Sequence, residues 1–131
     1  MAYATISKPS LHFNTKLYTG NIQTGHAITG VGFQPDWLWI KSRTNTEWHN
    51  VIDAVRGNTK FIYTNATNSE DTNSTRLESF DSDGFTVGNN DNTNKNGENF
   101  VAWNWKAGGA GSANTDGTNI TSTVSANTTA G

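Results

Sequence analysis

Residues 36–41 read Asp-Trp-Leu-Trp-Ile-Lys and carry the strongest strand signal in the chain. Successive side chains of a strand point to opposite faces, so Trp37 and Trp39 lie on one face. Leu38 and Ile40 lie on the other face, and both faces are therefore apolar. A strand of this kind belongs in the middle of a sandwich or against a partner subunit, because a solvent-exposed face would leave two indole rings in water.

Strand-like segments recur along the chain at short intervals. A second strong strand is expected at residues 99–106, where Val101, Trp103 and Trp105 share one face. Residues 47–55 fit either a helical turn or a strand, and we prefer a strand. The other expected strands are 11–18, 22–28 on a sheet edge, 60–63, and 76–80 joined to 85–87 as a hairpin. About eight short strands with a turn about every ten residues are typical of a β-sandwich or jelly roll.

The composition also favours an all-β class. The chain has 131 residues, enough for one ordinary domain, and 33% of them are hydrophobic and 15% charged. It is rich in Thr, which favours strands, and in Asn and Gly, which favour turns. A net charge of −2 excludes a basic field for nucleic acid, and no apolar run is long enough to span a membrane. Cysteine is absent, which excludes disulfides and thiol chemistry.

The predicted fold class is an all-β, sandwich-like or jelly-roll-like domain with extended N- and C-terminal arms. Residues 1–10 form the N-terminal arm, without the features of a signal peptide, and residues 11–106 form the β-sandwich domain. Within that domain, residues 89–98 are expected to form a long exposed loop. Residues 107–131 begin with a Gly/Ala/Ser linker. They are a disordered tail, a linker to a further module, or an extended arm that pairs with another chain.

The residues offer no arrangement typical of catalysis or metal binding. His12, His26 and His49 are far apart, and none has a carboxylate at metal-binding spacing. The acidic turn at residues 81–84 and the Asn-rich segment at 92–97 resemble parts of a calcium loop, but the bidentate Glu that ends such a loop is missing. Asx-type turns are the simpler explanation. We therefore expect a protein that is not an enzyme, with no catalytic residue, no metal and no cofactor.

Tryptophan side chains are the main candidates for a binding role. Trp37, Trp39, Trp103 and Trp105 are predicted to be packing or subunit-interface anchors, because they fall inside the two strongest strands. A platform on which sugar rings stack is the alternative use for these four indoles. Trp48 stands in a more polar segment, and it is the better candidate for ligand binding.

Five motifs occur in order along most of the chain. They are Tyr-Thr-Gly-Asn at 18–21, Gly-Phe-Gln-Pro-Asp-Trp-Leu-Trp-Ile-Lys at 32–41, Asp-Ala-Val-Arg-Gly at 53–57, Ser-Phe-Asp-Ser-Asp-Gly-Phe-Thr-Val-Gly at 79–88 and Val-Ala-Trp-Asn-Trp-Lys-Ala-Gly at 101–108. Together they resemble a domain of tail-fibre-like and other virion proteins of marine phages, cyanophages and pelagiphages among them. The resemblance implies a β-rich virion module, often followed by a lectin-like sandwich domain, and it implies no catalytic residues.

The resemblance favours a bacteriophage structural protein located in the virion, as a tail fibre, a fibre base or a capsid-decoration protein. We expect it to assemble with other virion proteins, as a homo-oligomer with a trimer favoured, and to bind neither nucleic acid nor membrane. The alternative is a carbohydrate-binding module that recognises host-surface glycans during host attachment. Relatives usually continue into the second module beyond the position where this sequence stops, so the receptor-binding part is expected there.

Overall fold

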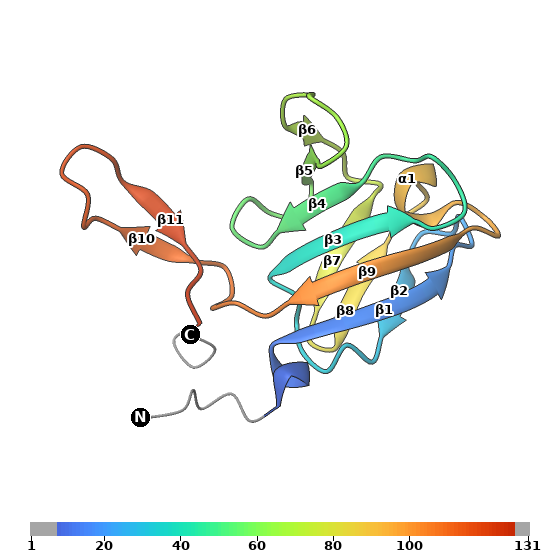
Figure 1. Cartoon of the computed structure of the whole chain (residues 1–131), viewed down its shortest axis with the longest axis horizontal. Coiled ribbons are helices and arrows are strands. Elements are labelled where there is room, and N and C mark those ends of the chain that lie inside the picture. Colours follow the sequence, from blue (N-terminus) through green and yellow to red (C-terminus); the bar gives the residue numbers. More distant parts are fainter. Residues whose placement is uncertain (1–7, 128–131) are drawn as a thin grey trace.

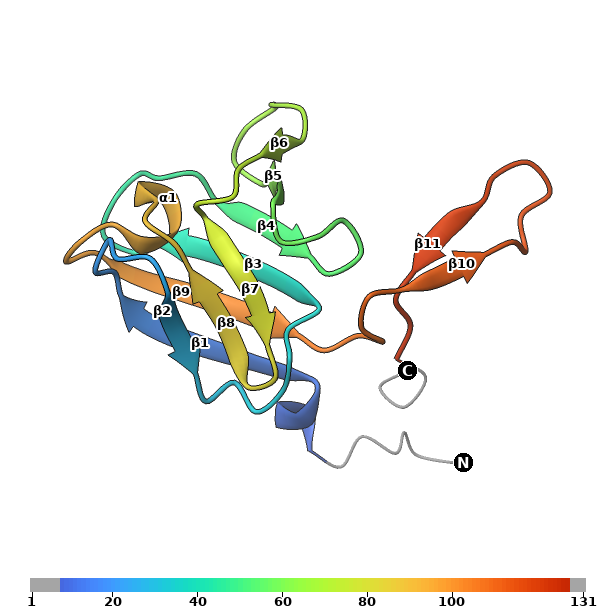
Figure 2. The ribbon, with the colours of Figure 1, turned by 180° about the vertical axis from the view of Figure 1, so that it is seen from behind.

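Two antiparallel sheets pack face to face in the body of the molecule (Figure 1, Figure 2). The computed structural model describes residues 8–127. The six-stranded sheet has the order β1 (Phe13–Thr19), β9 (Asn99–Trp105), β3 (Trp37–Ser42), β4 (Asn50–Asp53), β5 (Lys60–Tyr63) and β6 (Asp71–Thr72). The three-stranded sheet has the order β2 (His26–Thr29), β8 (Gly84–Val87) and β7 (Leu77–Asp81). The all-β, sandwich-like fold class is therefore confirmed.

The two Trp-x-Trp strands lie side by side in the middle of the larger sheet. β3 pairs with β9 along one edge and with β4 along the other. In this register Trp37 lies opposite Trp105, and Trp39 lies opposite Trp103. Both edges of β3 are therefore paired, but only one of its faces, that of Leu38 and Ile40, is buried in the sandwich, and the Trp face stays partly exposed.

The core lies between the two sheets and consists of aliphatic and phenylalanine side chains. From β3 it takes Leu38 and Ile40, both 0% exposed. Tyr18 and Phe80 are partly buried and pack against the core. The buried cluster is Ile28, Leu38, Ile40, Ile52, Phe61, Leu77, Phe85, Val87, Phe100 and Ala102.

Most of the predicted strands form close to their expected places. Residues 60–63 are β5, residues 47–55 contain β4, and β2 lies on the edge of the smaller sheet. β7 and β8 form the predicted hairpin. Gly84, the first residue of β8, has a φ of +150°, and a Cβ atom there would lie 1.9 Å from the carbonyl oxygen of Ile28. Only glycine fits this position, because β2 and β8 approach each other so closely.

The prediction of a long exposed loop at residues 89–98 was wrong. Asp91–Asn94 form the short helix α1, and its last two residues, Thr93 and Asn94, are 0% exposed. The Asn94 side chain donates a buried hydrogen bond to the carbonyl oxygen of Gly88 at 2.8 Å. An asparagine-rich segment is typical of turns, but its amide groups can equally well satisfy buried carbonyl groups that other segments bring to it.

Outside the sandwich, a two-stranded hairpin projects from the body (Figure 1). It consists of β10 (Ser112–Asn114) and β11 (Ser122–Val124), so this part of the 107–131 segment is an arm with strand structure. Pro9–Leu11 form one 3-10 turn ahead of β1. The rest of the predicted N-terminal arm, residues 1–7, lies outside the described residues, as do residues 128–131. Among the described residues, no helix has the length and apolar character needed to cross a membrane.

Candidate functional site

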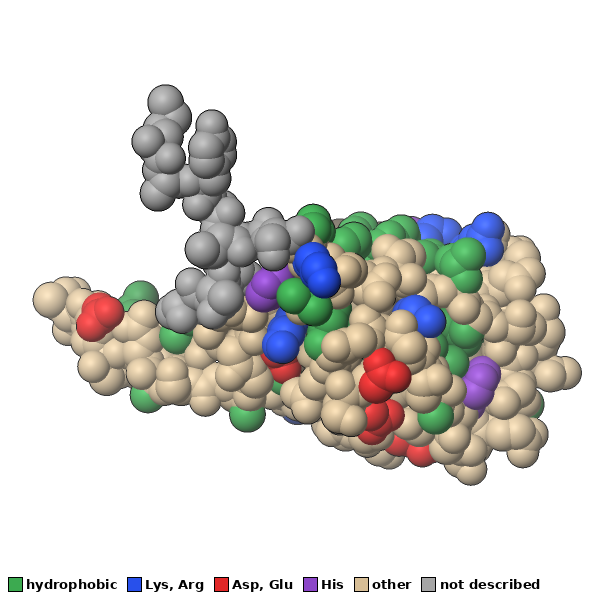
Figure 3. Space-filling model, turned by 90° about the horizontal axis from the view of Figure 1, so that it is seen from below, with side chains coloured by type: hydrophobic (Ala, Val, Ile, Leu, Met, Phe, Trp, Pro, Cys, Tyr) green, Lys and Arg blue, Asp and Glu red, His purple; other side chains and the backbone are tan. Residues whose placement is uncertain are grey.

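Apolar side chains cover the outer face of the six-stranded sheet, on the side away from the smaller sheet. The strand register aligns them in three rows that run across neighbouring strands. Figure 3 shows hydrophobic side chains along its upper margin, which is the side of the molecule that faces the viewer in Figure 1. The rows also contain the polar side chains of Asp53, Thr15 and Lys41, and they are Phe13, Trp105, Trp37 and Asp53; Thr15, Trp103, Trp39, Val51 and Ile62; and Leu17, Val101 and Lys41.

Five rings in these rows form one continuous chain of contacts, which we call the outer aromatic face. Its ring centres are 4.8 Å apart between Phe13 and Trp105, and 4.4 Å apart between Trp105 and Trp37. They are 6.3 Å apart between Trp37 and Trp39, and 5.0 Å apart between Trp39 and Trp103. Neighbouring rings are inclined to each other by between 48° and 79°. The face is therefore ridged and does not form one flat plane.

The outer aromatic face keeps much apolar surface in contact with solvent. All four indoles are partly exposed, and Phe13 and the neighbouring Leu17 are 38% and 61% exposed. Trp37 and Trp105 line an open apolar hollow of about 380 Å³. The indole N–H of Trp39 is buried, and it has no hydrogen-bond partner among the described residues. A contiguous apolar patch of this kind is typical of a contact surface.

The four predicted packing or interface anchors thus lie outside the core. Trp37 and Trp39 project outward, while Leu38 and Ile40 of the same strand fill the core. Sequence alternation separates these two faces, but it does not say which one is buried, because both are apolar. Phe13 belongs to the outer aromatic face, and Leu17 extends the apolar area beside it. Both are single apolar residues in a polar strand, so the sequence does not indicate that they lie on a contact surface.

A second aromatic cluster surrounds a buried guanidinium group. Arg76, just ahead of β7, is 4% exposed. Its guanidinium carbon lies 5.6 Å from the ring centre of Trp48, 5.2 Å from that of Phe61 and 5.3 Å from that of Tyr63. Cation–π attraction is strongest where the cation is shielded from water, so these rings stabilise the charge of Arg76. Trp48, the predicted ligand-binding candidate, belongs to this cluster and is 41% exposed.

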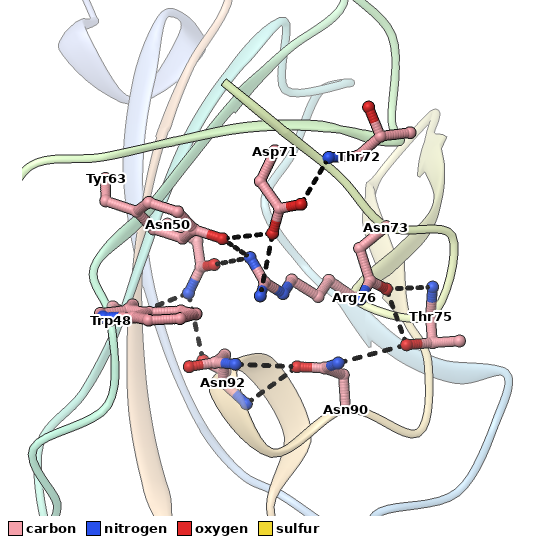
Figure 4. A network of polar contacts seen from close by, with 10 residues as sticks. All are labelled: Trp48, Asn50, Tyr63, Asp71, Thr72, Asn73, Thr75, Arg76, Asn90 and Asn92. Atoms are coloured by element: carbon pink, nitrogen blue, oxygen red, sulfur yellow. Dashed lines mark hydrogen bonds and ion pairs between the residues drawn. The ribbon is translucent and has the colours of Figure 1, made fainter. Parts of the chain in front are cut away.

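Polar side chains complete the surroundings of Arg76 (Figure 4). The guanidinium forms an ion pair with Asp71 at 3.3 Å, and it donates to the side-chain oxygen of Asn50 at 3.3 Å. It also donates to the Tyr63 hydroxyl, which in turn donates to the Asp71 carboxylate at 2.6 Å. Charge-assisted hydrogen bonds of this type are short and directional. Arg76 therefore fixes the positions of Tyr63 and Asp71 where β5 meets β6.

The same contacts set the protonation states of this cluster. The pKa of Asp71 is lowered, chiefly because its carboxylate accepts the hydrogen bond from the Tyr63 hydroxyl. The pKa of Tyr63 is raised, chiefly because burial disfavours the charged phenolate. At neutral pH Asp71 is therefore an ionised acceptor and Tyr63 a protonated donor.

Trp48 and Tyr63 form the apolar wall of a hollow of about 260 Å³, which we call the Trp48 pocket. Its polar rim comes from the segment that leads into β6: Asn68, Ser69, Glu70 and Asp71. Of these residues, only Trp48 is indicated by the sequence. Asp71 stands in a polar segment and Arg76 at the start of the next expected strand, and no periodic pattern shows that the fold brings them under one indole ring.

The three histidines do not form a site. His26 is engaged by Asn94, with its Nδ1 atom 2.8 Å from the Asn94 side-chain oxygen. Within residues 8–127, no group of three or more His, Asp and Glu side chains is arranged to hold a metal ion. The acidic turn at residues 81–84 holds a neighbouring loop in place. Its Asp83 carboxylate accepts hydrogen bonds from the backbone N–H groups of Gly30 and Gly32 at 3.0 Å and 2.6 Å.

The fold and these two clusters define a β-sandwich domain with an aromatic outer face and a separate aromatic pocket. The chain belongs to the DUF7483 family, described as a domain of unknown function, whose model matches residues 8–131. Comparisons with curated proteins and with solved structures gave no match.

Proposed function

We propose that this chain is a non-catalytic structural module of a bacteriophage virion, which joins a neighbouring copy of itself through the outer aromatic face. The observation that carries the proposal is the row of partly exposed indoles on the free face of the central sheet. Aromatic residues are enriched at the cores of protein interfaces, where they bury large areas at low cost in side-chain entropy.

The shape of the face favours a protein partner over a flat glycan platform. A sugar chain stacks best on rings that share one plane, whereas these rings are inclined by 48° or more. Inclined rings leave ridges and grooves that the side chains of a second sheet can fill, as in sandwich packing. Phe13 and Leu17 extend the apolar area to the edge strand β1, which widens the surface available to such a partner.

The assignment to a phage particle is supported by the ordered motifs between residues 18 and 108, which resemble those of virion proteins. Its test is to locate the chain on purified particles. A gold-labelled tag on the full protein is expected at a fixed place on heads or tails, repeated according to the symmetry of that place. If purified particles contain none of the protein, the virion assignment is wrong.

A further inference from the structure

The Trp48 pocket combines an exposed indole with a polar rim that the fold uses only in part for its own hydrogen bonds. Trp48 is 41% exposed although its ring also covers the guanidinium of Arg76. In the described part of the chain, the side chains of Asn68 and Ser69 make no hydrogen bond, and both are exposed. The pocket therefore offers an apolar wall and unused polar groups within one hollow.

The carboxylates of the rim are already paired with cations of the protein, so they do not favour a cationic ligand. Glu70 already pairs with Arg56 at 3.2 Å and lies 3.8 Å from the ammonium group of Lys60. Asp71 is paired with the buried Arg76 at 3.3 Å. Arg56 also pairs with Asp53 at 2.6 Å, so the carboxylates of Asp53, Glu70 and Asp71 face the cations of Arg56, Lys60 and Arg76. The charges balance, and the pocket carries no excess negative charge for a further cation to neutralise.

Asp71 keeps capacity to accept a hydrogen bond from a ligand. A carboxylate has about four acceptor sites on its two oxygens. One oxygen accepts from the Tyr63 hydroxyl and pairs with Arg76, and the other accepts from the Thr72 N–H at 2.7 Å. The second oxygen therefore has a lone pair available to a hydroxyl donor.

Contacts within the fold hold part of the pocket, the side chains of Trp48, Tyr63 and Asp71, before any ligand binds. Arg76 is buried, and its contacts hold Tyr63 and Asp71 in the arrangement that Figure 4 shows. The Trp48 ring lies against Tyr63, with ring centres 4.8 Å apart. A preorganised site avoids the free-energy cost of ordering side chains on binding.

We propose that the Trp48 pocket binds one ring of a neutral saccharide, with the indole against the C–H face of the sugar and Asp71, Asn68 and Ser69 toward its hydroxyl groups. The volume supports a single ring, because about 260 Å³ is below the size of pockets that hold drug-sized ligands, about 300–1,000 Å³. The site lies apart from the outer aromatic face, so binding here does not depend on the assembly role.

The test is an NMR titration of the full, ¹⁵N-labelled chain with the methyl glycosides of glucose, galactose, mannose and N-acetylglucosamine, each to about 50 mM. Choline chloride is titrated in parallel as a cation probe. We expect at least one glycoside to shift the Trp48 indole N–H signal and the amide signals of residues 68–71, with choline giving no such shift. The proposal is overturned if no glycoside moves these signals, if the shifts gather at the outer aromatic face, or if choline binds in place of every sugar.

Variants separate ligand binding from support of Arg76. Trp48→Ala is expected to weaken the binding by about tenfold or more, and Trp48→Phe to keep part of it. The double variant Asn68→Ala/Ser69→Ala leaves the Arg76 cluster intact, so its fold should not change. It is expected to weaken saccharide binding severalfold. This variant therefore tests the proposed site even if Trp48→Ala unfolds. Ile120→Ala, an exposed apolar residue on the distant hairpin, is the matched control and should bind as the wild type does. Unchanged affinity in the double variant would contradict the proposed role of the rim.

Discussion

Replacing Asn94 by Ala should destabilise the protein far more than its place in an asparagine-rich segment suggests. The side chain is 0% exposed and donates to the carbonyl oxygens of Gly88 and Gln23 at 2.8 Å and 2.9 Å. Its oxygen accepts from the Asn21 N–H at 2.9 Å. These bonds hold the segment after β1 against α1 and the end of β8.

The magnitude follows from the groups that lose their partner. Each buried polar group left without a hydrogen bond costs about 1–3 kcal/mol. The bond to Gly88 is fully buried, while those to Gln23 and Asn21 are partly buried and can regain water in the variant. We therefore expect a loss of about 3–5 kcal/mol in the free energy of unfolding, which is a large share of the about 5–15 kcal/mol typical of a domain.

Urea unfolding followed by tryptophan fluorescence measures this loss. With a urea dependence of about 2 kcal/mol per molar, the midpoint should fall by about 2 M. Asn96→Ala is the matched control, since Asn96 lies in the same segment and is exposed, and its midpoint should not change. A loss below about 1 kcal/mol for Asn94→Ala, or equal losses in the two variants, would refute the reasoning.

Two further predictions concern the turn region of the smaller sheet. The pKa of Asp83 is lowered by hydrogen bonds from N–H groups in the 30–32 loop, so its contribution to stability is present above the ordinary carboxyl pKa of about 4 and is lost as the pH falls through the lowered value. Urea midpoints of the wild type and Asp83→Asn should therefore differ at neutral pH and converge as the pH falls below the lowered pKa of Asp83, and a constant difference would argue against this linkage. Gly84→Ala should cost clearly more than about 2 kcal/mol, because a Cβ would meet the Ile28 oxygen at 1.9 Å in addition to the strain of the positive φ. Gly97→Ala, at a φ of +76° with open space around it, should cost only the backbone strain of about 1–2 kcal/mol, and equal losses would show that the close contact does not matter.

The strands could be predicted because their signals are local. Residues 36–41 alternate two apolar sets, and the hairpin at 76–87 has its turn residues between two short apolar runs. The face that becomes the core could not be predicted in the same way. In β9 the outward residues include Trp103 and Trp105, while Asn104 points inward at 0% exposure and donates to the backbone oxygens of Asn14 and Ala102 at 3.1 Å and 3.0 Å. A hydrophobic pattern predicts that such an asparagine faces solvent. Its inward position is explained by the backbone oxygens to which its amide group donates, and these partners cannot be found from the pattern.

The Trp48 pocket could be predicted only in part. An indole in a polar segment is unusual enough to single out Trp48, and the structure places it in the wall of a hollow. Arg76, Tyr63 and Asp71 come from three separate strands or loops, and their meeting depends on the pairing of β5 with β6. Contacts between residues so placed follow from the fold, and local sequence patterns carry no information on them.

Sedimentation velocity of the full chain across a range of concentrations tests the central claim, which is that the outer aromatic face joins copies of this protein. The wild type is expected to associate, with a trimer favoured, and Trp37→Ser should shift it to monomer. The variant should stay folded, because Trp37 lies outside the core cluster, although the loss of its contact with Trp105 should lower the urea midpoint. Ile120→Ser, which removes an exposed apolar side chain from the projecting hairpin, should associate like the wild type. A wild-type chain that stays monomeric at about 100 μM, or a Trp37→Ser variant that associates equally well, would contradict the claim.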